Sequence, residues 1–553
     1  MNIQNPILFA DYSDPDVIRA DGRYILTASS FNYVPGMPIL ISEDLVNWQL
    51  KAYAIDQIAE DPRQGVPHED SEAIGRRFEI PRHSEGVWAP SIRVHDGKYY
   101  IYYGMPDEGI YVIMAEDPLG PWTTPICVRP AKGFIDPCPY WDEDGRAYII
   151  HAYARSRIGF KSMLGIFEMT PDGTRAISDD QFIFDGNDPS HPALTIEGPK
   201  VYRRNGYYYI LAPAGGVKYG WQTALRSRSI HGPYEIRTVM EQGNTVINGP
   251  HQGGLVDTPD GKEWFLHFQD RGLYGRICHL QPVEWVDDWP VIGSDEDHDG
   301  IGNPVSAFPM NECGVQKRMQ ESSDTFRNHT IGLQWQWLGN LSRSPYGESS
   351  RADGIALKAM NLSEEAEPII WHSSNVLTQK LVMPEFRLDF RLDASGLKEG
   401  NRAGIVMMGG QYTSLDVRKE NGGIRLVLAE SEGDDSDRKE KEVNSFLLKE
   451  ADLSDLTLRM IFVRTSRADV SDQGEVICKA KPAEDLYYCS IESEKPELRL
   501  FWKIKDGPFA DTGCRYTPSD HTWVGAKTGF YALACRGAEE GTAEFLSVLA
   551  EEL

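Results

Sequence analysis

The feature that most constrains the fold is a turn-and-strand unit that occurs five times in the first half of the chain. Each unit is an Asp-Gly or Asn-Gly pair with an aromatic residue close behind it in an apolar run. The five pairs are Asp21-Gly22, Asp96-Gly97, Asp144-Gly145, Asn205-Gly206 and Asp260-Gly261. Because Asx-Gly pairs supply the positive φ angles of tight two-residue turns, each unit predicts a β-hairpin.

The spacing of these units predicts how the hairpins are organised. Successive pairs lie 75, 48, 61 and 55 residues apart, with a mean of about 60. Repeated sheet units of that size are typical of a β-propeller, and five units predict five blades. A second repeat supports the count, since three turn segments that follow hairpins end on Trp48, Trp122 and Tyr234. We therefore expect residues 1–293 to form a five-bladed propeller in an all-β chain.

Counting back from each turn gives one chemically distinctive residue per predicted blade. These residues lie seven to nine positions before the turns, and they are Asp14, Trp88, Asp136, Glu197 and His251. Because blades surround a single axis, equivalent positions near that axis converge. We therefore expect three carboxylates, a tryptophan and a histidine to face one pocket.

Three carboxylates at one site permit glycosidic bond cleavage. One acid protonates the leaving oxygen, and a second carboxylate activates water or attacks the anomeric carbon. A third, close to the acid, raises the pKa of that acid by like-charge repulsion. Taken alone, an Asp-Pro pair such as Asp14-Pro15 is usually a turn, and a Glu before Gly is usually a surface residue. The shared offset from the hairpins favours the catalytic interpretation of the set.

Two of the five residues allow other interpretations. Trp88 fits either a blade core or an aromatic wall against a sugar face. His251 lies in Gly249-Pro250-His251-Gln252-Gly253-Gly254, where it could be a core histidine, an axial metal ligand or a substrate contact.

Composition restricts the partners and the compartment. The formal net charge of −27 argues against nucleic acid and anionic membranes, because phosphates repel an acidic surface. The first ten residues have no basic region followed by a long apolar core, so we expect no signal peptide. The eight cysteines form no CxxC pair, which fits reduced thiols in a cytoplasmic protein.

The hairpin rhythm breaks in a segment that we interpret as a linker, residues 294–322. It contains Asp295, Asp297 and Asp299, followed by Gly300. Alternating acidic residues before a glycine resemble the first half of an EF-hand-type calcium loop, although Ser306 stands where the bidentate glutamate would be. A calcium site and a solvated acidic linker both remain open.

The remainder, residues 323–553, has a strand pattern without the Asx-Gly repeat and predicts a jelly-roll-like β-sandwich. We expect strands at residues 386–392, 404–408, 424–428, 456–463 and 498–502. The run from Glu430 to Glu442 is almost wholly polar and charged, so we expect a solvated loop there.

Several motifs give the first domain a family resemblance. They are Asn5-Pro6, Ser13-Asp14-Pro15-Asp16, Ser30-Phe31 with Pro35-Gly36, Val87-Trp88-Ala89-Pro90-Ser91, Ile135-Asp136-Pro137, Thr195 to Pro199, Gly275-Arg276 and Pro282-Val283-Glu284-Trp285. With them, residues 1–293 resemble glycoside hydrolase family 43, the five-bladed propeller β-xylosidases and α-L-arabinofuranosidases. The part from Asp324 on, with Gly332 to Trp337, is similar to the β-sandwich that follows the propeller in many β-xylosidases of that family.

The resemblance implies roles for individual residues. Asp14 matches the general base, Glu197 the general acid, and Asp136 the carboxylate that orients the acid and tunes its pKa. The family inverts, so Asp14 would activate a water molecule. The remaining matches are Phe31 and Arg276 as substrate contacts, His251 as an axial histidine that binds calcium in several members, and Trp523 as a sandwich aromatic that reaches towards the pocket. One departure is Tyr12-Ser13 before Asp14, where many β-xylosidases have His-Pro.

We therefore expect an exo-acting, inverting glycosidase that removes terminal pentoses from xylo-oligosaccharides or arabinoxylo-oligosaccharides, foremost a 1,4-β-xylosidase. An α-L-arabinofuranosidase, or an enzyme with both activities, is the main alternative. A retaining fructan hydrolase is disfavoured because its motif is Asn-Asp-Pro-Asn, whereas this chain has Ser13-Asp14-Pro15-Asp16. A non-catalytic carbohydrate-binding propeller is disfavoured by the presence of all three carboxylates. Family members with these two domains are often dimers or tetramers, which implies a homo-oligomer.

Overall fold

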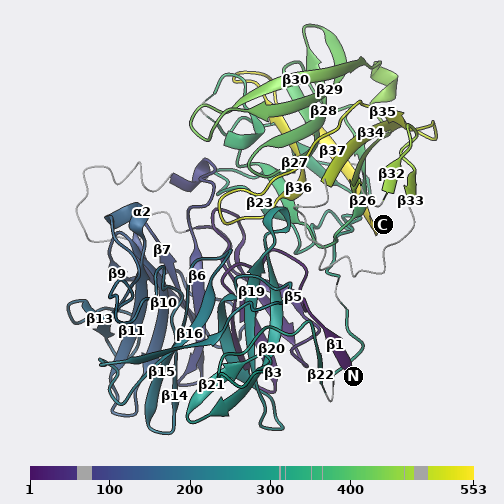
Figure 1. Ribbon diagram of the computed structural model, residues 1–553. Helices are drawn as coiled ribbons and strands as arrows, with labels where there is room; N and C mark the ends of the chain where they lie inside the picture. The colour runs from purple at the N-terminus through teal and green to yellow at the C-terminus, as the bar shows by residue number, and fades with distance from the viewer. Residues whose placement is uncertain are drawn as a thin grey trace.

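The protein is an all-β chain of two bodies, a ring of blades and a sandwich stacked on one end of it (Figure 1). The computed structural model describes residues 1–58, 77–310, 313–317, 319–349, 351–363, 365–465, 468–478 and 496–553. Helices in these ranges are short, and they are α2 (Arg155–Ile158), η1 (Arg77–Glu79), η2 (Gly272–Tyr274), η3 (Ile370–His372) and η4 (Glu450–Asp452). None of the described helices combines the length and apolarity that crossing a bilayer requires.

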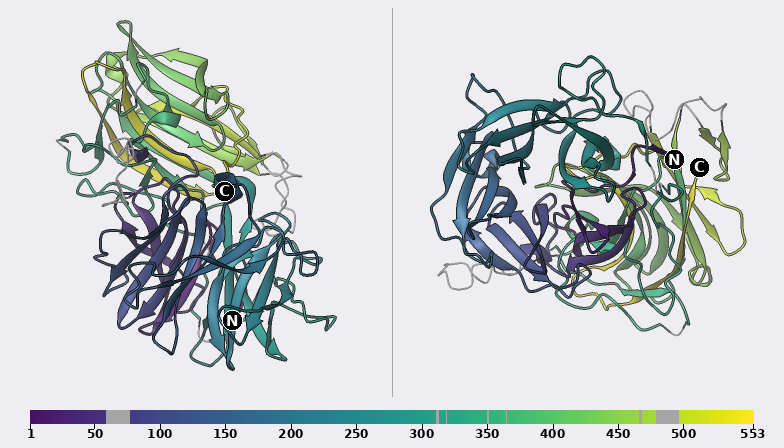
Figure 2. Two further views of the ribbon diagram at one scale, coloured as in Figure 1. Left: turned by 90° about the vertical axis from the view of Figure 1, so that its left-hand side faces the viewer. Right: turned by 90° about the horizontal axis from the view of Figure 1, so that it is seen from below.

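The first body confirms the predicted five-bladed propeller, since it consists of five four-stranded antiparallel sheets arranged around one axis (Figure 2). Blade 1 is β2 (Asp16–Ala20), β3 (Arg23–Thr27), β4 (Gly36–Ser42) and β5 (Gln49–Ile55). Blade 2 is β6 (Trp88–His95), β7 (Lys98–Met105), β8 (Gly109–Ala115) and β9 (Ile126–Pro130). Blade 3 is β10 (Phe134–Trp141), β11 (Ala147–Tyr153), β12 (Met163–Met169) and β13 (Gln181–Asp185). Blade 4 is β14 (Lys200–Arg204), β15 (Tyr207–Ala214), β16 (Trp221–Ser227) and β17 (Glu235–Met240). Blade 5 is β18 (His251–Asp257), β19 (Glu263–Asp270), β20 (Arg276–Val286) and β21 (Trp289–Ile292).

Every predicted Asx-Gly pair joins the first two strands of a blade. In three of the pairs both residues have positive φ, for example Asp21 at 50° and Gly22 at 76°, as a type I′ hairpin requires. In Asp144-Gly145 and Asp260-Gly261 only the glycine does. The turn residues were therefore a reliable local signal for the blade repeat.

The first strand of each blade lies against the axis and begins with a backbone irregularity that recurs in all five blades. A residue with positive φ stands there, and these residues are Asp14, Ala89, Asp136, Gly198 and Gln252. The strand pairing shifts register at this point in β6, β10 and β18, which is a β-bulge. The count from the turns had grouped Asp14 and Asp136 with Trp88, Glu197 and His251. In the structure, the residues equivalent to Asp14 and Asp136 lie one position later in the other three blades, at Ala89, Gly198 and Gln252.

The second body is a sandwich of two antiparallel sheets. The seven-stranded sheet has the order β23 (Gln336–Trp337), β25 (Val376–Lys380), β36 (Lys527–Ala534), β27 (Asn401–Met408), β28 (Tyr412–Glu420), β29 (Gly423–Glu432) and β30 (Lys439–Leu447). The six-stranded sheet has the order β24 (Ile355–Lys358), β37 (Thr542–Glu552), β26 (Phe386–Asp393), β31 (Leu456–Arg464), β34 (Pro496–Ile504) and β35 (Ala510–Asp511). A small hairpin pairs β32 (Ala468–Val470) with β33 (Val476–Cys478). The five predicted strand segments are all confirmed. The loop expected at residues 430–442 is confirmed for 433–438 and wrong at both ends, which belong to β29 and β30.

The connection between the bodies is bound to the start of the chain. Strand β1 (Asn2–Gln4) pairs antiparallel with β22 (Ala307–Pro309). The sandwich also contacts the propeller directly, since Val34 and Trp337 exchange two backbone hydrogen bonds of 3.0 and 2.6 Å. One hydrophobic cluster runs through both bodies, from Phe9 and Ile25 to Phe390 and Phe530. The two bodies therefore share a core.

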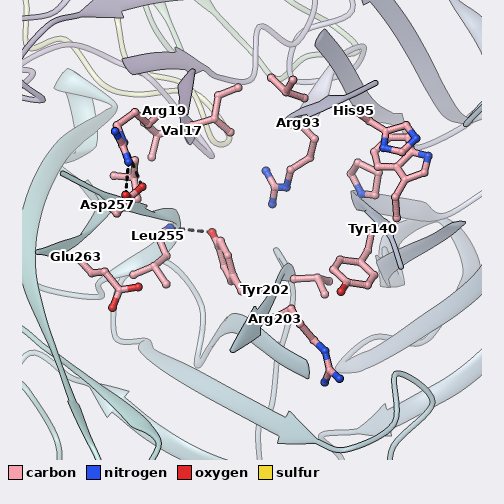
Figure 3. Close-up of a pocket in the computed structure, with 16 residues that line it drawn as sticks. Val17, Arg19, Arg93, His95, Tyr140, Tyr202, Arg203, Leu255, Asp257 and Glu263 are labelled. Carbon is pink, nitrogen blue, oxygen red and sulfur yellow. Dashed lines mark hydrogen bonds and ion pairs between the residues drawn. The ribbon is translucent and has the colours of Figure 1, made fainter. Parts of the chain in front are cut away.

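The propeller axis has two different ends. At the end away from the sandwich, a cavity of about 490 Å³ is lined by the last residues of the first strands of the blades, and Figure 3 shows Arg93 extending into it. Arg93 is bound from behind by the fully buried Asp16, with Nη1 and Oδ2 2.6 Å apart, and Arg19 at the rim is paired with Asp257. None of the predicted site residues lines this cavity. The candidate site lies at the opposite end, under the sandwich.

Candidate active site

Asp14 is held just before β2 by one donor from blade 5 and one from its own blade. Arg276 Nη1, at the start of β20, donates to Oδ1 over 3.0 Å, and Ser29 Oγ donates to Oδ2 over 2.6 Å. The Ser29 hydroxyl in turn accepts the backbone N–H of Ala89 over 2.7 Å. The side chain of Asp14 is 11% exposed, so the carboxylate is fixed in orientation but is not fully closed off. Its φ of 53° is a conformation that Asp and Asn adopt more readily than other side chains.

Asp136 is the most enclosed of the three carboxylates. Its Oδ2 accepts the backbone N–H of Gly198 over 2.8 Å and the side-chain amide of Gln252 over 3.1 Å. Burial raises the pKa of Asp136 to about 8, and the charges of Glu197 and then Asp14 act in the same direction. Those charge effects show that the three carboxylates are near neighbours, as the sequence predicted. The group is therefore suited to hold a proton within the cluster at neutral pH.

Glu197 is the most accessible of the three, with 27% of its side chain exposed. It stands immediately before Gly198, whose N–H binds Asp136, so the two acids are joined through one peptide unit. Its Oε1 lies 2.9 Å from Nε2 of His251, which is 1% exposed. His251 Nδ1 is buried and has no hydrogen-bond partner among the described residues. His251 therefore orients an acid that can still meet a ligand from the pocket side.

Aromatic residues from both bodies lie next to the groups that hold Asp14, since Trp88 directly precedes Ala89 and Phe31 follows Ser29 by two residues. Phe31 is buried and is held by two backbone hydrogen bonds with Val87, of 2.9 and 3.0 Å. Trp88 is also buried, and its indole N–H donates to the Ser84 carbonyl over 2.9 Å. Trp523 of the sandwich meets Trp88 edge-on, with ring centroids 4.7 Å apart, and is 39% exposed. Of these three aromatic residues, the exposed one therefore comes from the second domain.

The predicted metal ligands fall into two separate groups. In the described part of the chain, Asp295, Asp297 and Asp299 are the one set of three acidic, His or Cys side chains whose ligand atoms gather within 4.8 Å. Both oxygens of Asp295 accept backbone N–H groups, from Asp299 over 3.2 Å and Gly300 over 3.0 Å, which shapes the loop. Oxygen donors at alternate positions suit calcium. His251 is not in this set and contacts Glu197 instead.

Three residues that bind the carboxylates or the backbone of Arg276 were not found from the sequence. They are Ser29, which donates to Asp14, Gln252, which donates to Asp136, and Asp11, which accepts the backbone N–H of Arg276 over 3.0 Å. Gln252 directly follows His251. It would have been identified if residues had been aligned on the recurrent positive-φ position and not on the hairpin turns. Asp11 has no local signal, because its partners lie far along the chain.

Comparison with known proteins decides the family of this site. Residues 3–290 match Glycosyl hydrolases family 43, and this segment is more than half of the 553 residues and contains all three carboxylates. The chain belongs to glycoside hydrolase family 43. Residues 323–548 match the beta xylosidase C-terminal concanavalin A-like domain, which corresponds to the sandwich. The predicted family and the predicted two-domain fold are thus confirmed, and this family 43 chain is a glycoside hydrolase.

Named relatives of this family 43 enzyme cover most of its length. A provisionally named beta-xylosidase of Xylanibacter ruminicola is 41% identical over 429 residues, 75% of this chain and 74% of the relative. A beta-xylosidase of Formosa agariphila is 30% identical over 495 residues, 81% of this chain and 80% of the relative. Among solved structures, a xylan beta-1,4-xylosidase from Bacillus halodurans has a TM-score of 0.76 at 21% identity. The match covers 100% of both chains. That structural likeness supports the fold alone.

Proposed function

We propose that this enzyme is an exo-acting, inverting glycosidase that releases terminal pentoses from xylo-oligosaccharides, foremost as a β-xylosidase. The observation that carries the proposal is the set of three carboxylates with three different environments at one end of the propeller. Asp14 is bound by Arg276 and Ser29, Asp136 is buried with a raised pKa, and Glu197 is the accessible acid. The relatives named beta-xylosidase support the choice of pentose.

The environments assign one step to each carboxylate. Asp14, fixed by two donors, takes a proton from a water molecule that attacks the anomeric carbon. Glu197, held by His251 but exposed towards the pocket, protonates the departing oxygen. Asp136 is too enclosed to meet substrate. It acts as a positioning residue that keeps the proton shared by Asp136 and Glu197 in place. Phe31, Trp88, Trp523 and Arg276 enclose the terminal sugar.

An α-L-arabinofuranosidase activity is the second candidate, alone or together with the first. A non-reducing end alpha-L-arabinofuranosidase of Bacteroides ovatus is 28% identical over 386 residues, 66% of this chain and 67% of that protein. Xylopyranose and arabinofuranose can present similar hydroxyl groups to the same carboxylates. The two activities therefore have to be distinguished by the measured rates of hydrolysis of xylosides and arabinofuranosides.

The deciding experiment is a panel of xylo-oligosaccharides, arabino-oligosaccharides and nitrophenyl pentosides with the products identified. We expect xylose from the non-reducing end at the highest rate, with the inverted anomer as the first product in NMR spectra. A faster release of arabinose would favour the second candidate, and retention of configuration would contradict the role of Asp14. Hydrolysis of no pentoside, with sugars still bound, would indicate a binding propeller.

We also propose that calcium, if bound, is held by Asp295, Asp297 and Asp299, where it would brace the loop after β21. Running the same panel with and without a chelator tests this assignment. We expect the chelator to lower the unfolding temperature while the rate at 25 °C stays unchanged, because these residues lie outside the carboxylate cluster. A chelator that abolishes hydrolysis in the folded enzyme would instead support a metal at His251.

Replacing Asp136 by Asn should shift the alkaline limb of the kcat/KM profile to lower pH. In the wild type, the negative charge of one acid in the Asp136–Glu197 pair opposes ionisation of the other, and both interact with Asp14. The neutral amide removes that repulsion together with the group whose pKa is about 8, so the alkaline limb should move to lower pH. Asn keeps an acceptor for Gly198 and tolerates the φ of 56° at this position. A pH–rate profile measures the shift, and an unmoved limb would contradict the pairing.

The same variant has a readout that does not depend on activity. The pKa of Asp136 is higher in the folded chain, about 8, than its ordinary value of 3.8, so its contribution to stability is complete at acid pH and is lost as pH rises between these values. Asp136→Asn lacks this loss. The unfolding temperature of the variant relative to the wild type should therefore rise from pH 5 to pH 8.

A further inference from the structure

Asp11 is a buried carboxylate three residues before Asp14 and belongs to neither the predicted nor the proposed catalytic set. Its two oxygens accept backbone N–H groups from different domains. Oδ1 accepts from Arg276 of blade 5 over 3.0 Å, and Oδ2 accepts from Gly525 of the sandwich over 3.0 Å. Its side chain is 4% exposed. A single carboxylate thus joins the two bodies at the edge of the active site.

The two loops that meet over Asp11 are packed backbone to backbone. A Cβ at Gly275 would lie 2.3 Å from the Asp11 Cγ, and a Cβ at Gly525 would lie 2.5 Å from the Gly275 nitrogen. The contact continues in a hydrogen bond of 2.7 Å from the Ala526 N–H to the Leu273 carbonyl. Only glycine at both positions permits this approach, so the sandwich loop is seated directly on the loop that carries Arg276.

Charge keeps Asp11 ionised in this buried place. Burial raises its pKa, but Lys527 and Lys380, followed by the two backbone N–H groups, lower it, and the net pKa is below the ordinary value. Lys527 Nζ lies 3.6 Å from Oδ2, and its side chain is 3% exposed. Asp11 is therefore a carboxylate that accepts hydrogen bonds only, and both of its oxygens are needed.

Both loops lead to groups that face the substrate. On one side, Arg276 donates through Nη1 to Asp14 over 3.0 Å. On the other side, Gly525 lies two residues after Trp523, an exposed aromatic residue of the sandwich that meets Trp88 edge-on. Ser13, which stands between Asp11 and Asp14, adds a longer link, with its hydroxyl 3.3 Å from Asp11 Oδ1 and 3.4 Å from the Trp523 carbonyl.

We propose that Asp11 is a positioning residue that makes the sandwich domain part of the active site. It fixes Arg276 against Asp14 and, through its other oxygen, fixes the Trp523 loop over the pocket. The inference rests on the proposed glycosidase function of this site. It goes beyond that function because it makes the contact between Arg276 and Asp14 in the propeller depend on the docking of the second domain.

Asp11→Asn tests the proposal with an isosteric change. Either orientation of the amide turns its NH₂ group towards one of two N–H donors, so the variant must release the Arg276 loop or the Gly525 loop. We expect kcat on the best nitrophenyl pentoside to fall by ~10- to 100-fold, in line with the cost of misplacing a catalytic contact by about 1 Å. Gly525→Ala, which separates the loops without changing charge, should reproduce the loss if Asp11→Asn does not fold.

Tyr53→Phe is the matched control. It also removes one hydrogen bond between the bodies, from the Tyr53 hydroxyl to the Leu333 carbonyl over 2.9 Å, but on the outer strand of blade 1. We expect its kcat to equal that of the wild type. An equal loss in Tyr53→Phe and Asp11→Asn would reduce Asp11 to a general interface residue and overturn the proposal.

A double-mutant cycle with Arg276→Ala separates positioning from stability. If Asp11 acts through Arg276, Asp11→Asn should lower kcat far less in the Arg276→Ala background than in the wild type. Independent, additive losses would overturn the link between Asp11 and Arg276.

Hydrogen–deuterium exchange gives a readout without substrate. Asp11→Asn should speed exchange in at least one of the segments 273–276 and 523–527, whereas Tyr53→Phe should leave both unchanged. Faster exchange in neither loop would overturn the inference even if the enzyme is an active pentosidase. A wild type that hydrolyses no pentoside would instead contradict the proposed function, while the exchange result would still decide the link between the two loops.

Discussion

Replacing Asp14 by Asn is expected to lower kcat/KM by at least ~10³-fold on every pentoside, because the base that activates water is lost. The amide has the same shape, can still accept one hydrogen bond from Arg276 or Ser29, and tolerates the φ of 53° at this position. The fold should therefore be retained. The measurement is kcat/KM for nitrophenyl pentosides with leaving groups of different acidity, and the loss should be similar for all of them.

Asp21→Asn is the control for this change. It makes the same substitution at nearly the same backbone angle, φ 50°, in the first hairpin turn of the same blade. We expect it to leave kcat/KM unchanged. Activity of Asp14→Asn within ~10-fold of the wild type would place the base elsewhere.

Replacing Glu197 by Gln should cause a loss that depends on the leaving group. Gln cannot donate the proton that a poor leaving group needs, so hydrolysis of xylo-oligosaccharides should fall by at least ~10²-fold. A dinitrophenyl pentoside, which departs without a proton, should lose far less. The amide oxygen can still accept from His251 Nε2, so the side chain should keep its place. Rates plotted against the pKa of the leaving group measure this dependence.

Glu235→Gln provides the comparison for Glu197→Gln. Glu235 lies in the outer strand of the same blade, is exposed, and pairs with Arg226. Its replacement should leave the leaving-group dependence of the wild type intact. A loss in Glu197→Gln that is equal for good and poor leaving groups would contradict a general acid at this position.

The two variants together test the division of roles inside the cluster. Asp14→Asn should lower all rates alike, whereas Glu197→Gln should make the rate depend strongly on the substrate. The structure gives this contrast a physical basis, since Asp14 is held from behind by Arg276 and Ser29 while Glu197 is the carboxylate with 27% of its side chain exposed.

The propeller could be predicted because its signal is local and is repeated. Asp21-Gly22 and its four counterparts encode a turn within two residues, and their spacing gives the number of blades. Rotation about one axis then predicts that Asp14, Asp136 and Glu197 converge. The structure places these three side chains within reach of one another's charge. Their chemical roles stay predictions that the variants above test.

What the sequence did not predict depends on backbone geometry or on distant contacts. The bulge at the start of β18 shifts the equivalent position to Gln252, one residue after His251, and a count of residues does not detect that shift. Asp11 is 514 residues from Gly525, so no local pattern relates them.

The charged run at residues 430–442 was misinterpreted at both ends for a different reason. It belongs to the hairpin of β29 and β30, and β30 is the outermost strand of the seven-stranded sheet. Lysine and glutamate on such an edge keep other chains from pairing with it. The same composition is equally typical of a solvated loop, and composition alone cannot separate the two.

The bond between Arg276 and Asp14 has a consequence for a chain that is still being synthesised. Asp14 emerges with the first blade and Arg276 only with the last, 262 residues later, and the sandwich loop that docks beside them follows after a further 249 residues, at Gly525. Each blade is one uninterrupted segment and can form as it leaves the ribosome, but the pocket cannot. A nascent chain therefore completes the surroundings of Asp14 only when almost the whole protein has been made.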